Sequence, residues 1–102
     1  MNQSVEEHKV DEVIAQLVAA ASKRGYQPMS VWTGTRYIPL QEQGTMEVVD
    51  IVAASMKPTM VFQNEEGQLL EVGLDTRFGA DTIRGCTDHA DADAIWDDMI
   101  NP

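Results

Sequence analysis

The chain has 102 residues, of which 17 are acidic and 7 are Lys or Arg, and its formal net charge is −10. This length is typical of one domain, so we expect residues 1–102 to form a single unit around one hydrophobic core. The charge argues against direct binding of nucleic acid or of an anionic membrane, because those contacts need clustered Lys and Arg. A partner recognised by charge should therefore be a basic protein.

Cys86 is the only cysteine, so an intramolecular disulfide cannot form. A lone cysteine is typical of a reducing compartment. The first residues lack the basic and apolar regions of a signal peptide, and no apolar run reaches the ~20 residues that a membrane-spanning helix needs. These features predict a cytoplasmic protein that does not enter membranes.

An amphipathic helix is predicted at the N-terminus. Ser4 and Glu7 have the spacing of a capping box, which predicts that the helix begins at Ser4. Gly25 predicts its end, with Lys23 and Arg24 in the last turn. The apolar positions follow the spacing of a single helix face: Val10, Val13, Ile14, Leu17, Val18 and Ala21.

Residues 30–40 are rich in β-branched and aromatic side chains and predict a strand. Gly34 indicates a bulge or tight bend within it, and Pro39 restricts its end to a sheet edge. Residues 45–57 fit either a strand or a helix. Their polar positions favour the helix slightly, because they lie on one side of a helix but on both faces of a strand.

Residues 59–74 predict a β-hairpin around Asn64-Glu65-Glu66-Gly67, whose ends suit a type I turn with a glycine bulge. In the register that this turn sets, Phe62 faces Leu70 and Met60 faces Val72. That register collects the apolar residues on one face, whereas a one-residue shift mixes apolar and polar sets.

A C-terminal helix is predicted over residues 88–100, after a loop at 75–86 that has room for one short element. Thr87 or Asp88 can cap this helix. Its apolar stripe consists of Ala92, Ile95, Trp96, Met99 and Ile100. The complete pattern predicts an α+β fold of two layers, in which the N- and C-terminal helices pack on an antiparallel sheet of three or four strands.

Four residues near the C-terminal helix are candidate metal ligands: Asp88, His89, Asp91 and Asp93. Their spacing does not match an EF-hand loop, and a zinc site would need more His or Cys than Cys86 and His89 supply. Aspartates also collect at the start of a helix because its dipole favours negative charge. That ordinary explanation is preferred over a metal site.

Asp88, Asp91 and Asp98 share one side of the predicted helix, with Asp93 and Asp97 beside its apolar stripe. Such a surface could imitate the phosphates of DNA and inhibit a nucleic-acid-binding protein. A solvated polar face is the commoner role of such a charge run.

No catalytic constellation or cofactor motif stands out. Cys86 has only His89 nearby, and His8 is the other histidine. No phosphate-binding glycine motif occurs, although the segment 33–36 could form a small anion nest beside Arg36. The sequence therefore predicts no cofactor and favours a protein without catalytic activity.

The preferred function is a small interaction protein, an adaptor or regulator, that forms a homo-oligomer, with a dimer favoured. Residues that could contact a partner are Trp32, Tyr37, Trp96, Asp91 and Asp98. One alternative is a small-molecule-binding protein with a pocket between helices and sheet, lined by Trp32, Tyr37, Phe62 and Trp96. Two further alternatives are the DNA mimic and a small metal-dependent enzyme.

Overall fold

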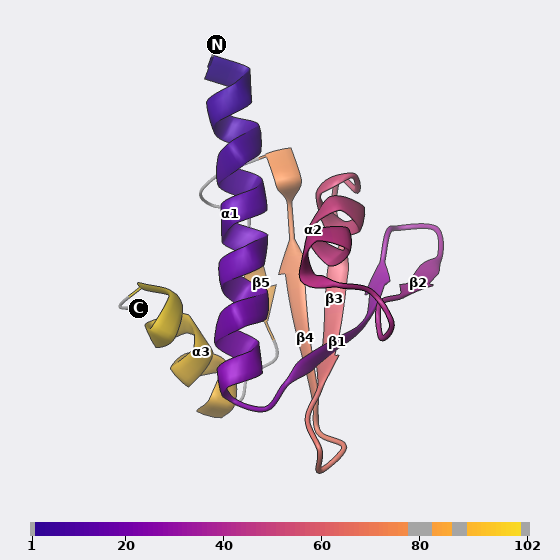
Figure 1. The fold of residues 1–102 in the computed structure, drawn as a ribbon, viewed down its shortest axis with the longest axis vertical. Coiled ribbons are helices and arrows are strands. Elements are labelled where there is room, and N and C mark those ends of the chain that lie inside the picture. The colour runs from indigo at the N-terminus through magenta and orange to yellow at the C-terminus, as the bar shows by residue number, and fades with distance from the viewer. Residues whose placement is uncertain (1, 78–82, 87–89, 101–102) are drawn as a thin grey trace.

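The structure is a computed structural model that describes residues 2–77, 83–86 and 90–100. It has the α+β fold that the sequence predicts, with one strand more than expected (Figure 1). The elements in chain order are α1 (Asn2–Lys23), β1 (Gln27–Trp32), β2 (Tyr37–Pro39), α2 (Thr45–Ala53), β3 (Thr59–Gln63), β4 (Leu69–Leu74), β5 (Ile83–Cys86) and α3 (Ala90–Ile100).

Helix α1 begins at Asn2, so the prediction that it starts at Ser4 is wrong by two residues. The helix propensities of Asn, Gln and Ser are only tenths of a kcal/mol less favourable than those of better helix formers. A helix can therefore extend past a capping signal at little cost in free energy. Its end is as predicted. Gly25 has φ 83° and donates its N–H to the Ser22 carbonyl at 3.0 Å, while Tyr26 N–H donates to Ala21 at 2.9 Å. This is the Schellman arrangement, which places glycine in the left-handed region.

The segment 30–40 forms two strands and not one. Gly34 has φ 103°, and Thr33 N–H donates to the Arg36 carbonyl at 3.0 Å, so the chain reverses there. Strand β2 lies at one edge of the sheet, which is where Pro39 was expected. Since proline has no N–H to donate, the outer side of this short edge is a poor template for another strand.

The ambiguous segment 45–57 contains helix α2, which ends at Ala53. Val48, Val49 and Val52 are its buried face. The helix stops before Lys57 because the next residues turn toward the end of β4, where the carbonyls of Ser55 and Met56 accept hydrogen bonds from Thr76.

The predicted β3–β4 hairpin is confirmed in its register, with Met60 opposite Val72 and Phe62 opposite Leu70. Asn64 closes the turn, since its side-chain oxygen accepts the N–H groups of Glu66 and Gln68 at 3.1 and 2.8 Å. Gly67 has φ 83°, as the bulge requires.

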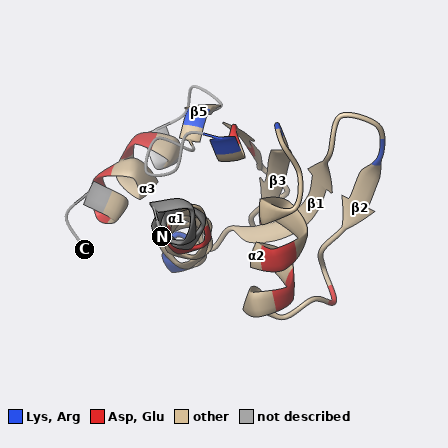
Figure 2. Ribbon diagram, turned by 90° about the horizontal axis from the view of Figure 1, so that it is seen from above, with Lys and Arg blue, Asp and Glu red and all other residues tan. Residues whose placement is uncertain are grey.

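The five strands are antiparallel and lie in the order β2-β1-β3-β4-β5. Strand β3 is therefore the centre of the sheet, although α2 and the β2 strand separate it from β1 along the chain. Helix α1 contacts both α2 and α3, and seen from above the helices form one layer beneath the sheet (Figure 2).

The core lies between this helix layer and one face of the sheet. Residues with 0% exposure include Ile14 of α1, Val31 of β1 and Phe62 of β3. Strand β4 alternates as the hairpin register requires, since Leu70 and Val72 are buried and Leu69 and Glu71 are exposed. The described part of the chain has no helix long and apolar enough to cross a bilayer.

Candidate functional site

The face of the sheet that points away from the helices is the candidate functional surface, and we call it the uncovered face. Side chains on it come from the positions that alternate with the core residues. Trp32 follows buried Val31, and Tyr37 precedes Ile38, which packs against the core. None of the described helices packs on this face (Figure 2).

Trp32 and Tyr37 form the most prominent feature of the uncovered face. They are directly opposed on β1 and β2, and their ring centroids are 4.8 Å apart at an interplanar angle of 49°. Tyr37 is 64% exposed. Trp32 is half-buried beside it, and such an aromatic pair offers a large, rigid contact area that loses little conformational entropy on binding.

Gly73 and Gly85 form the opposite part of the same face, where they are directly opposed on β4 and β5. Neither has a positive φ. A Cβ built on Gly85 would meet nothing within 4 Å, and one on Gly73 would meet only the Gly85 carbonyl oxygen at 3.8 Å. Neither backbone conformation nor crowding by the described residues therefore requires glycine at these two positions.

The predicted pocket of Trp32, Tyr37, Phe62 and Trp96 does not form. Phe62 is buried on the helix side of the sheet, while Trp32 and Tyr37 lie on the other side. Trp96 is on α3, which lies across the molecule from β2 (Figure 1). The alternation of strand side chains and the distance between α3 and β2 together separate these aromatic residues.

Trp96 is half-exposed at 46% and borders a small space between α1, β4, β5 and α3. That space is about 20 Å³, which is room for about one water molecule. Its neighbours Ile95 and Met99 pack into the core, so Trp96 lies at the rim of the apolar stripe. The core beside Trp96 is filled and offers no cavity for a small molecule.

A shallow hollow of about 220 Å³ lies where the end of α1, the start of β1 and the start of α2 meet. Its polar lining is uncharged and includes Ser22, Gln27, Gln43 and Thr45. The hollow contains none of the candidate residues from the sequence. Apart from buried Tyr26, its polar side chains are exposed to solvent, so they are poorly fixed in orientation for selective binding of a small molecule.

The structure describes only some of the acidic residues that the sequence suggests as candidates. Asp98 forms an ion pair with Arg24, with Nε 3.2 Å from Oδ2, and this pair ties α3 to the end of α1. Asp93 and Asp97 are exposed on α3. Asp88 and His89, together with the side chains of Asp91 and Cys86, lie outside the described part of the structure, so the metal and DNA-mimic hypotheses stay predictions. Among the residues whose placement is described, no three potential ligands gather around a common point.

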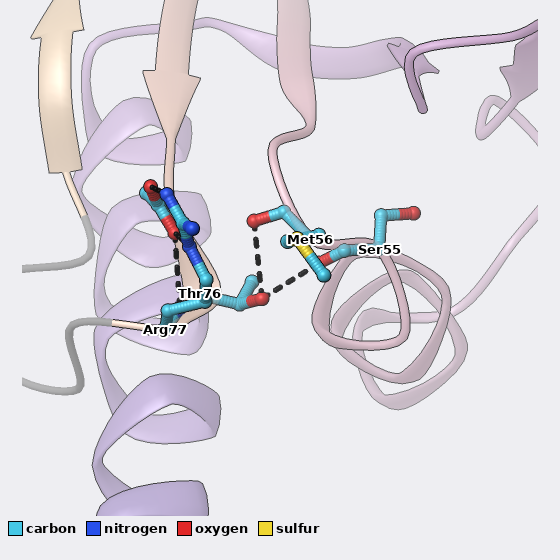
Figure 3. Close-up of polar contacts among 5 residues, drawn as sticks. Ser55, Met56, Thr76 and Arg77 are labelled. Carbon is cyan, nitrogen blue, oxygen red and sulfur yellow. Dashed lines mark hydrogen bonds and ion pairs between the residues drawn. The ribbon is translucent and has the colours of Figure 1, made fainter.

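The strongest polar cluster links the end of β4 to the segment after α2 (Figure 3). Thr76 donates its hydroxyl to the Ser55 carbonyl at 2.7 Å and its N–H to the Met56 carbonyl at 2.9 Å. Arg77 donates from Nε and Nη2 to the two carboxylate oxygens of buried Asp75 at 2.9 and 2.6 Å. The hydrogen bonds from Arg77 lower the pKa of Asp75 to about 2. This cluster has a structural role, because its polar groups are satisfied by one another.

The Thr33–Arg36 segment, considered as an anion nest, forms the β1–β2 turn. Thr33 uses both its N–H and its hydroxyl to bond the Arg36 carbonyl, at 3.0 and 3.3 Å. These donors close the hairpin and do not point to a common anion.

No protein-family model, curated protein or solved structure matches the chain.

Proposed function

We propose that the protein is a non-catalytic interaction protein of the cytoplasm that binds protein through the uncovered face of its sheet. The observation that carries the proposal is the Trp32–Tyr37 pair, which lies on the side of the sheet away from the described helices. Aromatic residues are enriched in protein interfaces, where their burial supplies much of the binding energy.

The remaining surface supports an adaptor in place of an enzyme. In the described residues, the Asp75–Arg77 ion pair is engaged in holding the fold together. The exposed carboxylates of α2, Glu47 and Asp50, lie on the helix layer. These carboxylates therefore lie away from the uncovered face and leave its aromatic pair to make the contact.

Site-specific photo-crosslinking in living cells tests this proposal. A benzophenone amino acid replaces Tyr37 in one variant and Met46 in a matched control, since Met46 is 71% exposed but lies on α2. We expect light-dependent protein adducts from position 37 and not from position 46. The same adducts from both positions, or none from position 37, would contradict the proposal.

A further inference from the structure

One row of directly opposed residues crosses the whole uncovered face. From β2 to β5 its members are Tyr37, Trp32, Thr59, Gly73 and Gly85. Opposed residues of antiparallel strands project to the same face, so the row is two aromatic rings, one small side chain and two positions without a side chain. We call Tyr37 and Trp32 the raised half of the row, and Gly73 and Gly85 the recessed half. Thr59, on the central strand, lies between them.

Nothing in the residues that the structure describes explains the recessed half. Glycine weakens a strand interior, and it commonly marks a bulge or a place where another molecule approaches closely. A bulge does lie beside Gly73, where the β4–β5 register shifts. Neither glycine has a positive φ, however, and neither position is crowded, so this bulge would accept a residue with a side chain. The remaining explanation is close approach from outside.

We infer that the occupant of the uncovered face is a second copy of this chain, packed face to face about a twofold axis that runs parallel to β3. This inference rests on the proposed function, since it names the partner of the same surface. Such a rotation exchanges β2 with β5 and β1 with β4, and it leaves β3 facing its own copy. Tyr37 then lies over Gly85 of the second copy, Trp32 over its Gly73, and Thr59 over its Thr59.

The raised half of each copy thereby fills the recessed half of the other. Face-to-face sheets pack about 10 Å apart, and side chains from the two faces interdigitate across that distance. A twofold interface must be complementary to itself. The row meets that condition because Tyr37 and Gly85 each lie two strands from β3, on opposite sides, and Trp32 and Gly73 each lie one strand from it.

The charge of the chain also favours a second copy on this face over a contact between helix layers. Two molecules that each carry a net charge of −10 repel most where their carboxylates gather. The five residues of the row are uncharged, although Glu71 lies on the same face two residues from Gly73. Face-to-face packing brings these neutral rows together and directs the acidic helix layers of both copies away from each other.

Sedimentation equilibrium of the purified full chain tests the inference. We expect a dimer whose Kd rises at least about tenfold in Gly85→Val and in Tyr37→Arg, since a few aromatic residues carry much of the binding energy of an interface. The matched control is Met46→Arg, which adds the same charge on α2 and should leave the Kd unchanged. Because a Cβ at Gly85 meets none of the described residues within 4 Å, Gly85→Val should keep the circular dichroism spectrum and cooperative thermal unfolding of a folded protein.

Crosslinking tests the register independently. Thr59→Cys, made in a Cys86→Ala background, places two thiols across the axis, where a short bismaleimide should join them. Met46→Cys in the same background is the control and should stay uncrosslinked.

The outcomes separate the inference from the proposed function. A dimer that is weakened by Gly85→Val and crosslinks through position 59 supports both. A monomer at every concentration, or a dimer that neither variant weakens, overturns the inference. In that case, adducts from position 37 to a different protein in cells would leave the proposed function standing, and their absence would overturn it as well.

Discussion

Asp75 and Arg77 form a two-pronged ion pair in which the carboxylate is 7% exposed and the guanidinium is 50% exposed, with 2.6 Å between Oδ2 and Nη2. The Arg77 backbone N–H also donates to Asp75 Oδ1 at 3.1 Å. Together with the Thr76 hydrogen bonds to Ser55 and Met56, this pair fixes the end of β4 against the segment that follows α2.

We expect Asp75→Asn to unfold at a lower temperature than the wild type at pH 7. Arg77 lowers the pKa of Asp75 from 3.8 to about 2, so the ionised carboxylate stabilises the fold at every pH above 3.8. That contribution is lost as the pH falls from 3.8 through about 2, because the carboxyl then becomes protonated in the folded state as well. The difference in unfolding temperature between Asp75→Asn and the wild type should therefore shrink over this pH range.

Thermal unfolding followed by circular dichroism at a series of pH values checks this prediction. Glu65→Gln is the matched control, because Glu65 is an exposed carboxylate in the β3–β4 turn and its loss should change little at any pH. If the difference in unfolding temperature between Asp75→Asn and the wild type stayed constant down to pH 2, the ionised Asp75–Arg77 pair would not be the cause of that difference.

Phe62→Ala should lower the free energy of unfolding by about 3–5 kcal/mol, the usual cost of removing a buried aromatic ring. Phe62 is fully buried at the centre of the core, whereas Tyr37 is 64% exposed. Tyr37→Ala, measured in urea at concentrations where the chain is monomeric, should change the free energy by less than about 1 kcal/mol. Equal losses would mean that Tyr37 also supports the fold, and its exposure would then be no argument for binding.

The local parts of the fold could be predicted because their signals are carried by neighbouring residues. Gly25 ends α1, and Asn64 with Gly67 sets the register of β3 and β4. That register already implies that Thr59 faces Gly73, which is one step of the row on the uncovered face. Turn chemistry and the two-residue period of a strand are sufficient for such predictions.

The rest of the site depends on pairings between distant segments. Nothing near Trp32 in the sequence shows that β1 pairs with β3, because β2 and α2 intervene. Strand β5 had no clear period, so Gly85 could not be placed opposite Gly73. The pocket with Phe62 and Trp96 was wrong for the same reason, since aromatic composition does not say which side of the sheet each ring occupies.

The three hairpin and strand glycines should respond differently to alanine. Gly67→Ala should destabilise the protein by about 1–2 kcal/mol, because φ 83° is strained for any residue with a Cβ. Gly73→Ala should be neutral or stabilising by up to about 1 kcal/mol, since it restricts the unfolded chain without a clash in the folded one. Urea unfolding of both variants, with Gly85→Ala as a third, checks this at concentrations where the chain is monomeric. Destabilisation by Gly73→Ala as large as that of Gly67→Ala would show that the fold itself needs the recessed position.

The Arg24–Asp98 pair should contribute little to stability although it joins α1 to α3. Both side chains are partly exposed, at 42% and 29%, and solvent screens such pairs. We expect Asp98→Asn to lower the free energy of unfolding by less than about 1 kcal/mol at low salt, and by nothing measurable in 1 M NaCl. Asp97→Asn is the control, since Asp97 is an exposed neighbour on the same helix. If Asp98→Asn instead weakened binding of a basic protein while leaving stability intact, Asp98 would belong to the acidic partner surface that its sequence position first indicated.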